Sequence, residues 1–366
     1  MKTSSNPFVP YDTKIETTDG VFSDQEVGLA NRNHGLLLET LELDTTPTGA
    51  HYLLNHFDIP IIDPTKHKLR FQGAFEISFE LSMETIRSLP QTTMPVTMEC
   101  AGNGRAGMSP RSHSMPWLYE AVGTSEWTGT PLLPIIQRAN PNADVVEISF
   151  LGADFGYDMG DGHYFGRSLT LKQLEELDVM LVYAMNGEPL LPQHGAPLRI
   201  IVPGWYGMAS VKWLDRIEAL TQPYDGFQQV RTYRFRQQPN EIGEPIQDIR
   251  VKSLMKPPGV PDWSSRKRFL RAGNVQLIGR AWSGSGRAID KVEVKIGDVW
   301  HQADLEKSIK KYAWTKWTLN WDALPGEFVL RCRATDEAGN IQPLVPEWNL
   351  SGFANNAAQS VHIFVE

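Results

Sequence analysis

Short β-branched apolar runs, separated by loops rich in proline and glycine, most constrain what this chain can fold into. Runs of this kind, bounded by turn-forming residues, are typical of buried strands. Residues 170–178, TLKQLEELD, instead show the pattern of a short helix with Thr170 as its N-cap. Because the helices are few, we predict an α+β domain, and the lack of a GxGxxG motif argues against a dinucleotide fold. The strand-like runs are VTMEC (96–100), VVEISFL (145–151), VMLVYAM (179–185) and LRIIVP (198–203).

Strands of a second style follow a turn-rich passage that contains the stiff connector Lys256-Pro257-Pro258-Gly259. They alternate apolar and polar residues and are separated by turns such as SGSGR, LPGE and EAGN. Alternation at this spacing predicts an immunoglobulin-like β-sandwich, with WTLNWDALPGEFVLRCRATDEAGN as two strands of one sheet. Such a domain usually supplies packing or an oligomer interface. The strand-like runs are NVQLIGRAW, KVEVKI, WTLNW, FVLRCRATD and SVHIFV.

The length of the chain, 366 residues, exceeds one ordinary hydrophobic core and predicts two domains. Residues 1–35 are polar and rich in turn formers, so we expect an extended N-terminal arm there. We predict the first domain over residues 36–222, a connecting segment over 223–262 and the second domain over 263–366.

The net charge of −8 is spread along the chain, which argues against a nucleic-acid partner because phosphates select a basic face. One basic cluster, Arg266, Lys267, Arg268 and Arg271, indicates a solvated loop or helix end, with docking of an anionic partner protein as the alternative. No apolar run approaches the roughly eighteen residues that span a bilayer, and the N-terminus lacks an export-signal pattern. We therefore expect a cytoplasmic protein without a membrane span, or a periplasmic one if a signal has been removed.

The segment ECAGNGRAGMSP (99–110) holds one of the two cysteines, and this pair is too small for a disulfide scaffold. Cys100 ends a predicted strand and enters a glycine-rich loop, where backbone N–H groups and Arg105 would lower the pKa of its thiol. A thiolate is the soft ligand that transition metals prefer. Two alternatives stay open from this segment alone: a buried structural cysteine, and a thiol nucleophile whose histidine base is not identified.

A second cluster lies in LPQHGAPLRIIVPGWYGMASVKWL (191–214). It places His194, Arg199 and Lys212 around a strand and a glycine-rich turn. Three cationic side chains beside exposed backbone donors form an anion site, and phosphate is the usual occupant. The alternative is that these are ordinary surface cations flanking a core strand.

Six short motifs resemble, in order and approximate spacing, the molybdopterin domain of sulfite oxidases. Trp348-Asn349-Leu350 with Gly352 resembles the end of their dimerisation domain, so the resemblance covers the chain from about residue 36 onward. It implies an α+β molybdopterin-binding (sulfite oxidase-like) domain followed by an immunoglobulin-like dimerisation domain, and hence a homodimer. The motifs are Cys-Ala-Gly-Asn at 100–103, Pro116-Trp117, Glu126-Trp127-Thr128-Gly129, His194-Gly195-x-Pro197-x-Arg199, Val202-Pro203-Gly204 and Val211-Lys212-Trp213.

The resemblance implies a role for each matching residue. Cys100 matches the cysteine that binds molybdenum, and Arg105 matches an arginine close to the metal's oxo groups. With them, Trp117 and Tyr233 match residues of the substrate pocket. The implied cofactor-binding residues are Cys100, the Asn55-His56 pair, Asp154 and Ser168 in the cofactor loops, and His194, Arg199 and Lys212, which hold the pyranopterin largely at its phosphate.

Two positions depart from the family pattern on the substrate side. The family's substrate arginine precedes the Asn-His pair, where this chain has Leu54, and a second pocket arginine is replaced by Ser351. Guanidinium groups bind a compact oxyanion such as sulfite by charge-assisted hydrogen bonds, so their loss weakens sulfite binding unless something replaces them.

The resemblance therefore implies a molybdenum- and molybdopterin-dependent oxidoreductase. Oxygen-atom transfer with sulfite is the leading reaction, and a separate electron carrier takes up the electrons. Another substrate, or reduction of an S- or N-oxide, is the first alternative. A cofactor-free interaction module is the second, although intact Cys100, His194, Arg199 and Lys212 argue against it.

Overall fold

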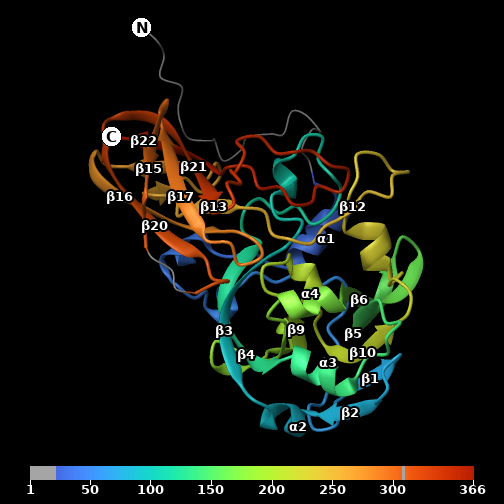
Figure 1. The fold of residues 1–366 in the computed structure, drawn as a ribbon. Helices are drawn as coiled ribbons and strands as arrows, with labels where there is room; N and C mark the ends of the chain where they lie inside the picture. The colour runs from blue at the N-terminus through green and yellow to red at the C-terminus, as the bar shows by residue number, and fades with distance from the viewer. Residues whose placement is uncertain (1–21, 307–309) are drawn as a thin grey trace.

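The computed structural model describes residues 22–306 and 310–366, and Figure 1 shows two bodies joined side by side. A β-sandwich built by the last third of the chain lies at the upper left, and an α+β domain fills the lower right. The long strand β3 (Thr92–Glu99) runs along the edge of the α+β domain that faces the sandwich. The predicted fold class, an α+β domain followed by a β-sandwich, is confirmed, while its immunoglobulin-like character stays a prediction.

Two five-stranded sheets form the first domain. One has the strand order β2-β1-β10-β5-β6, in which β1 and β10 are parallel and the other neighbours antiparallel. The other has the order β3-β4-β7-β8, with β9 pairing with β7. The bounds are β1 Lys68–Gly73, β2 Phe79–Ser82, β4 Val122–Pro131, β5 Glu147–Asp158, β6 Asp161–Thr170, β7 Met180–Met185, β8 Glu188–Pro189, β9 Arg199–Ile201 and β10 Leu214–Leu220.

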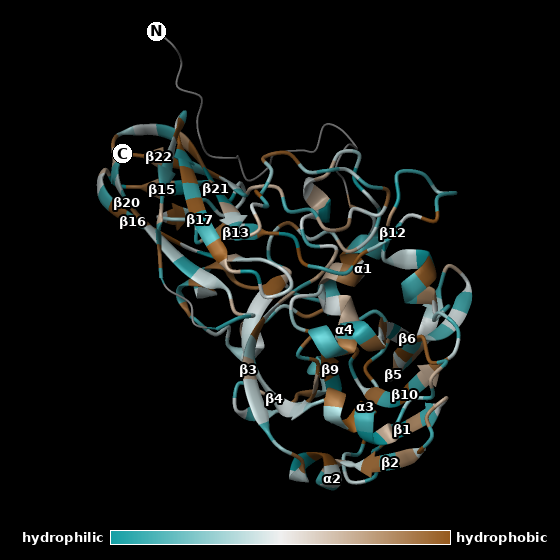
Figure 2. Cartoon of the chain, in the orientation of Figure 1, coloured by the Kyte–Doolittle hydropathy of each residue, from teal (hydrophilic) through white to brown (hydrophobic). Residues whose placement is uncertain are grey.

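Short helices connect these strands, and Figure 2 shows α3 carrying both hydrophilic and hydrophobic residues, as expected for a helix with one buried side. The predicted cap of α4 is confirmed, because the Thr170 side chain accepts the N–H of Gln173 in a complete capping box. The bounds are α1 Asp24–Arg32, α2 Met83–Ser88, α3 Leu133–Ala139 and α4 Leu171–Glu176, with 3₁₀ turns at Leu38–Glu42, Thr48–Ala50, Arg105–Gly107, Pro192–His194 and Gly207–Ala209 and a π-turn at Gln228–Thr232.

The end of the predicted N-terminal arm is helical rather than extended. Helix α1 begins at a capping box, in which Ser23 accepts the N–H of Glu26 and the Glu26 side chain bonds back to Ser23. This helix packs on the protein, because Glu26 is buried and forms an ion pair with Arg111. The first part of the arm, residues 1–21, lies outside the described residues.

The second domain packs a four-stranded sheet, β13-β16-β20-β19, against a six-stranded sheet, β14-β15-β22-β21-β17-β18. Their inner faces enclose one hydrophobic cluster, which includes Trp317 of the first sheet and Cys332 of the second. A two-stranded ribbon, β11-β12, lies in the connecting segment. The bounds are β11 Arg234–Phe235, β12 Glu244–Pro245, β13 Lys252–Met255, β14 Val260–Pro261, β15 Arg268–Leu270, β16 Gly273–Trp282, β17 Ile289–Ile296, β18 Val299–Gln302, β19 Asp304–Leu305, β20 Thr315–Ala323, β21 Gly326–Asp336 and β22 Ser360–Val365.

Two expectations about this domain were wrong. The runs predicted as two strands of one sheet belong to different sheets, β20 to the four-stranded and β21 to the six-stranded one, because the chain crosses the core between them. Arg268, predicted in a solvated basic cluster, is buried and donates to the carbonyls of Pro257, Pro258 and Gly259. Alternation along a strand identifies its buried face, and it does not identify the neighbouring strand.

Hydrophobic packing joins the two domains. The largest cluster of buried apolar residues, centred on the first domain, also contains Trp282, Trp314 and Phe353 from beyond the connecting segment. Among the described residues, no helix has the length and apolar character needed to cross a membrane.

Candidate active site

Cys100 follows directly after the last residue of β3, where the chain turns into the glycine loop. Its backbone N–H donates to the Ala121 carbonyl at 2.9 Å, and its Sγ accepts from the Gly102 amide at 3.4 Å. The side chain is 7% exposed and lines a cavity whose open space, mouth included, is about 670 Å³.

The protonation of Cys100 differs from the expectation drawn from the sequence. Burial raises the pKa of the thiol above its usual value, and the Arg105 charge and the Gly102 amide oppose this only in part. The expectation of a lowered pKa was therefore wrong, because desolvation outweighs the dipoles of the loop.

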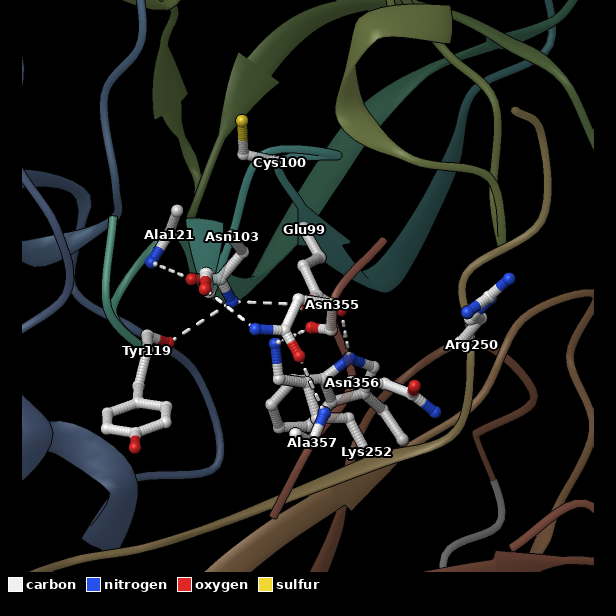
Figure 3. Close-up of polar contacts among 12 residues, drawn as sticks. Glu99, Cys100, Asn103, Tyr119, Ala121, Arg250, Lys252, Asn355, Asn356 and Ala357 are labelled. Carbon is white, nitrogen blue, oxygen red and sulfur yellow. Dashed lines mark hydrogen bonds and ion pairs between the residues drawn. The ribbon is translucent and has the colours of Figure 1, made fainter. Parts of the chain in front are cut away.

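A buried polar network holds the loop from behind, and Figure 3 shows the Cys100 sulfur pointing away from it. Glu99 Oε1 accepts hydrogen bonds from Asn103 Nδ2 at 2.9 Å and from Lys252 Nζ at 2.8 Å, while its Oε2 accepts from Trp282 Nε1 at 2.8 Å. The Lys252 ammonium also donates to the Asn355 carbonyl at 2.9 Å. The loop that carries Cys100 is thus tied to strands β13 and β16 of the second domain. Sequence reasoning missed Glu99 and Lys252, although a glutamate inside a predicted buried strand was a signal that a cation lay opposite it.

The last segment of the second domain also contacts the loop directly. The Ala354 amide donates to the Ala101 carbonyl at 2.6 Å, and the Asn355 side chain donates to the Gly104 carbonyl at 2.7 Å. Arg105 is buried, and its Nε donates to the Ser351 carbonyl at 2.8 Å. The position at which the family has a second arginine therefore holds Arg105 in place through its backbone.

The predicted anion cluster gathers at the same cavity as Cys100. His194, Arg199 and Lys212 all line it. The Arg199 guanidinium donates to the carbonyls of His194 at 2.9 Å and Ser210 at 3.0 Å, while Lys212 donates to the Leu54 carbonyl at 2.9 Å and to Asn55 Oδ1. The alternative of ordinary surface cations fails, because Arg199 is 4% exposed and burial lowers the pKa of Lys212 well below its usual value.

The charge balance of the cavity wall fits an anionic cofactor. Within residues 22–306 and 310–366, no carboxylate forms an ion pair with Arg105, Arg199 or Lys212. Asp154 also lines the cavity, with its buried Oδ1 unpartnered in the described structure, and burial raises the pKa of this carboxyl to about 6. Burying cations without counter-ions costs free energy, and the phosphate of a bound ligand would offset this cost. Asp154 could then accept hydrogen bonds from the N–H groups of the same ligand.

Among the side chains that can bind a metal, Cys100 is the thiol that lines the cavity. No group of three His, Cys, Asp or Glu side chains gathers into a metal site in the part of the chain that the structure describes. The thiol and the cations together fit the molybdenum–molybdopterin group that the sequence resemblance implies.

A histidine and a tyrosine meet across the cavity from Cys100's loop. His56 Nε2 and the Tyr233 hydroxyl are 2.7 Å apart, and both residues line the cavity. Burial lowers the pKa of His56 to about 4 and raises the pKa of Tyr233 above its usual value, so the neutral imidazole accepts from the phenol. His51 also lines the cavity, with a pKa lowered to about 4 by burial, and sequence reasoning missed it.

Three other predicted residues, Asn55, Trp117 and Ser168, do not line the cavity. Asn55 is buried, and its side chain reaches the cavity through Lys212. Trp117 packs in the same buried cluster as Cys100. Ser168 is not brought to the cavity: its hydroxyl donates to Glu147 at 2.6 Å and accepts from Gln229 at 2.8 Å. Leu54, at the family's substrate-arginine position, lines the cavity with an apolar side chain.

Comparison with known families accounts for both domains. Residues 56–228 match the oxidoreductase molybdopterin binding domain, and residues 244–366 match the Mo-co oxidoreductase dimerisation domain. Among solved structures, the sulfane dehydrogenase SoxCD of Paracoccus pantotrophus has a similar fold, with a TM-score of 0.75 and 23% identity over 98% of this chain and 90% of that chain.

Curated relatives extend the likeness over most of the chain. Mouse mitochondrial sulfite oxidase is 31% identical over 87% of this chain, which spans only 61% of that relative. Sulfite oxidase of Arabidopsis thaliana is 30% identical, covering 85% of this chain and 86% of the relative. An NADH nitrate reductase of Brassica napus is 31% identical, covering 85% of this chain and 37% of the relative. The chain therefore belongs to the sulfite oxidase family of molybdenum-cofactor oxidoreductases.

Proposed function

We propose that this protein transfers an oxygen atom at a molybdenum held by Cys100, with sulfite as the leading substrate. One observation carries the proposal: a buried thiol, two buried guanidiniums (Arg105 and Arg199) and the partly buried Lys212, none of the three cations with a carboxylate partner in the described structure, face or flank one cavity. The membership of the family supports the same reaction class. The relatives differ in their substrates, since they include sulfite oxidases and a nitrate reductase.

The residues of the cavity would divide the work between cofactor and substrate. Lys212, Arg199 and His194 would bind the phosphate of the cofactor, and Cys100 would bind the metal. When bound, the molybdenum cofactor supplies the two-electron and oxygen-transfer chemistry. Tyr233 keeps its proton at neutral pH, because burial raises its pKa, and the hydroxyl can turn from His56 to donate its hydrogen bond to a substrate oxygen. The backbone contact with Ser351 and the Met115 carbonyl would hold the Arg105 guanidinium near the same substrate.

Reduction of an S- or N-oxide is the second candidate. It is favoured by Leu54, which gives the cavity an apolar side chain where the family binds an anion. A less charged oxide would fit this wall better than sulfite would. The third candidate, a cofactor-free interaction module, has no support from the cavity, whose buried cations call for an anion.

Metal analysis combined with a substrate panel tests the proposal. We expect about one molybdenum per chain after expression in a host that makes the cofactor, and turnover of sulfite with an oxidised acceptor. Cys100→Ser should abolish turnover and the thiolate-to-molybdenum absorption band, while Cys332→Ser, the matched control in the sandwich core, should keep both. Turnover only of S- or N-oxides with a reduced dye would select the second candidate, and protein without molybdenum would contradict both.

We also propose a homodimer formed through the second domain and a separate carrier that takes the electrons. The match to a dimerisation domain supports the first point, and light scattering tests it. The cytoplasmic location stays a prediction, and fractionation of the native host would check it.

A further inference from the structure

Arg167 is a buried cation that the functions assigned so far leave unexplained. It lies on β6, two residues after Phe165, and is 3% exposed. Alternate residues of a strand point to the same face, so Arg167 leaves β6 on the side from which Phe165 lines the cavity. Phe165 in turn packs on the His56 ring, with 4.9 Å between the ring centroids. The guanidinium therefore lies behind Phe165 and Tyr233, two residues that line the cavity.

The hydrogen bonds of Arg167 leave its charge uncompensated. One terminal nitrogen donates to the Gln228 carbonyl at 2.6 Å, but the buried Nε has no partner among the described residues. Glu147 contributes to the electrostatics of Arg167, yet its carboxylate accepts from the Ser168 hydroxyl and the Tyr224 amide and forms no ion pair with the arginine. Burial lowers the pKa of Arg167 to about 10, so it stays charged at neutral pH. A fixed positive charge in such a setting is expected to have an anionic partner.

Tyr233 links this charge to the cavity. The Arg167 guanidinium carbon lies 5.8 Å from the centroid of the Tyr233 ring, and the Tyr233 hydroxyl points to His56. Arg105 approaches the same ring through Phe353, which is 5.0 Å from both the Arg105 guanidinium and the Tyr233 ring. Both guanidiniums oppose the rise in the pKa of Tyr233. Two cations thus act on one phenol, whose hydroxyl is the group that meets the substrate.

We propose that Arg167 determines substrate charge at this site: its guanidinium, acting on and beside Tyr233, makes the cavity selective for a small oxyanion. The proposal rests on the proposed function and names a positioning residue on β6 for that reaction. It supplies a positive charge from a residue that the family resemblance did not single out. A purely structural alternative is that Arg167 only fastens the π-turn Gln228–Thr232 through the Gln228 carbonyl.

Substitutions in the molybdenum-loaded protein separate these roles. Arg167→Met removes the charge and keeps much of the volume, Arg167→Lys keeps the charge, and Arg167→Gln serves if the methionine variant fails to fold. Arg268→Met is the matched control, because Arg268 is also buried and bonded to backbone carbonyls but lies on β15 of the sandwich. Calorimetry with sulfate, which has no lone pair on sulfur to accept oxygen, measures anion affinity without turnover, and steady-state assays measure sulfite KM and kcat.

We expect Arg167→Met to raise the Kd for sulfate and the KM for sulfite by roughly tenfold, the loss expected when a buried charge close to the bound anion is removed, with kcat changed less than about threefold. Arg167→Lys should stay within about threefold of the wild type, and Arg268→Met should match it. An unchanged sulfate Kd in Arg167→Met would overturn the inference. So would equal losses in the methionine and lysine variants with kcat falling as far as kcat/KM, which is the structural outcome.

The two proposals fail in different ways. If the wild type does not oxidise sulfite but loses sulfate affinity in Arg167→Met, the inference stands and sulfite oxidation is wrong. If the wild type oxidises sulfite and Arg167→Met leaves both KM and sulfate Kd unchanged, the function stands and the inference is wrong.

Discussion

Glu99 and Lys252 form a buried ion pair, 2.8 Å between Oε1 and Nζ, with each side chain 1% exposed. The two residues come from different domains, and Glu99 is the residue before Cys100 (Figure 3). Three further hydrogen bonds hold the pair: Glu99 accepts from Asn103 and Trp282, and Lys252 donates to the Asn355 carbonyl. The pair therefore couples the position of the Cys100 loop to the folding of the second domain.

Removing one partner of this pair should destabilise the protein strongly. Lys252→Met leaves Glu99 buried without a counter-ion, which costs about 3–5 kcal/mol of unfolding free energy. Denaturant titration measures the loss, and molybdenum content per chain should fall with it because the loop loses its anchor. The control Lys256→Met breaks a partly exposed pair with Glu42 and should leave both measurements unchanged. Equal stability of Lys252→Met and the wild type would show that the pair holds nothing in place.

Lys212 should matter for cofactor retention more than for folding. Its ammonium contacts only neutral acceptors in the described structure, so the phosphate of the cofactor would be its charged partner. We expect Lys212→Met to lower cofactor affinity by roughly tenfold or more, as for one charge-assisted hydrogen bond. Competition for released pterin, followed by its fluorescence, measures this. Arg216→Met, which lies in β10 just after Lys212 but is paired with Glu218, should retain the cofactor, and a full complement of pterin in Lys212→Met would refute the assignment.

The stability of the cofactor-free protein should fall as the pH drops from about 6.5 toward 4. Burial lowers the pKa of His51 to about 4 and that of His194 to about 3. Between these values and the ordinary histidine pKa, the unfolded chain binds protons that the folded protein does not, so acid favours unfolding. Each histidine contributes about 1.4 kcal/mol per pH unit at the steepest point. Asp154, with its pKa raised to about 6, has the opposite sign and offsets one of them.

The histidine contribution can be isolated by substitution. His51→Gln should remove one histidine's share of the slope, so the variant and the wild type should converge as the pH falls from 6.5 to 5. Unfolding free energies at several pH values measure the two slopes. Identical slopes in the two proteins would mean that His51 titrates normally.

Leu54→Arg should strengthen sulfite binding. The new guanidinium would enter the cavity wall beside Lys212, whose contact with the Leu54 carbonyl does not depend on the side chain. A gain of one charge-assisted hydrogen bond lowers KM for sulfite by roughly tenfold or more. Leu37→Arg, at an exposed position, is the control. If Leu54→Arg gives no gain in affinity, the cavity has been rebuilt around the leucine and uses another cation.

Local signals in the sequence were sufficient for most strands and for one helix cap. The run at 179–185 predicted β7, and Thr170 predicted the start of α4, because strand alternation and capping depend on residues a few positions apart. The same kind of signal was overlooked at Ser23 and Glu26, whose spacing marks a capping box in the supposed arm. Sheet membership was beyond these signals, as the separation of β20 from β21 shows.

Only those residues of the site that belong to family motifs were predicted from the sequence. His194, Arg199 and Lys212 were expected near Cys100, and the structure brings all four to one cavity. Arg167 and Lys252 were not expected, because their roles arise from contacts with residues far away in the chain, Tyr233 and Glu99. Such partners are set by tertiary packing, and neither composition nor spacing encodes them.

The segment that brings Ala354 and Asn355 to the carbonyls of Ala101 and Gly104 has a consequence for how this protein can evolve. The two domains are not interchangeable modules, because the sandwich supplies hydrogen-bond donors that fix the shape of the Cys100 loop. Grafting the sandwich of a distant relative onto this catalytic domain would exchange those donors along with the scaffold. Natural recombination is therefore expected to pass the two domains on as one heritable unit, with the junction near residue 250 under joint selection.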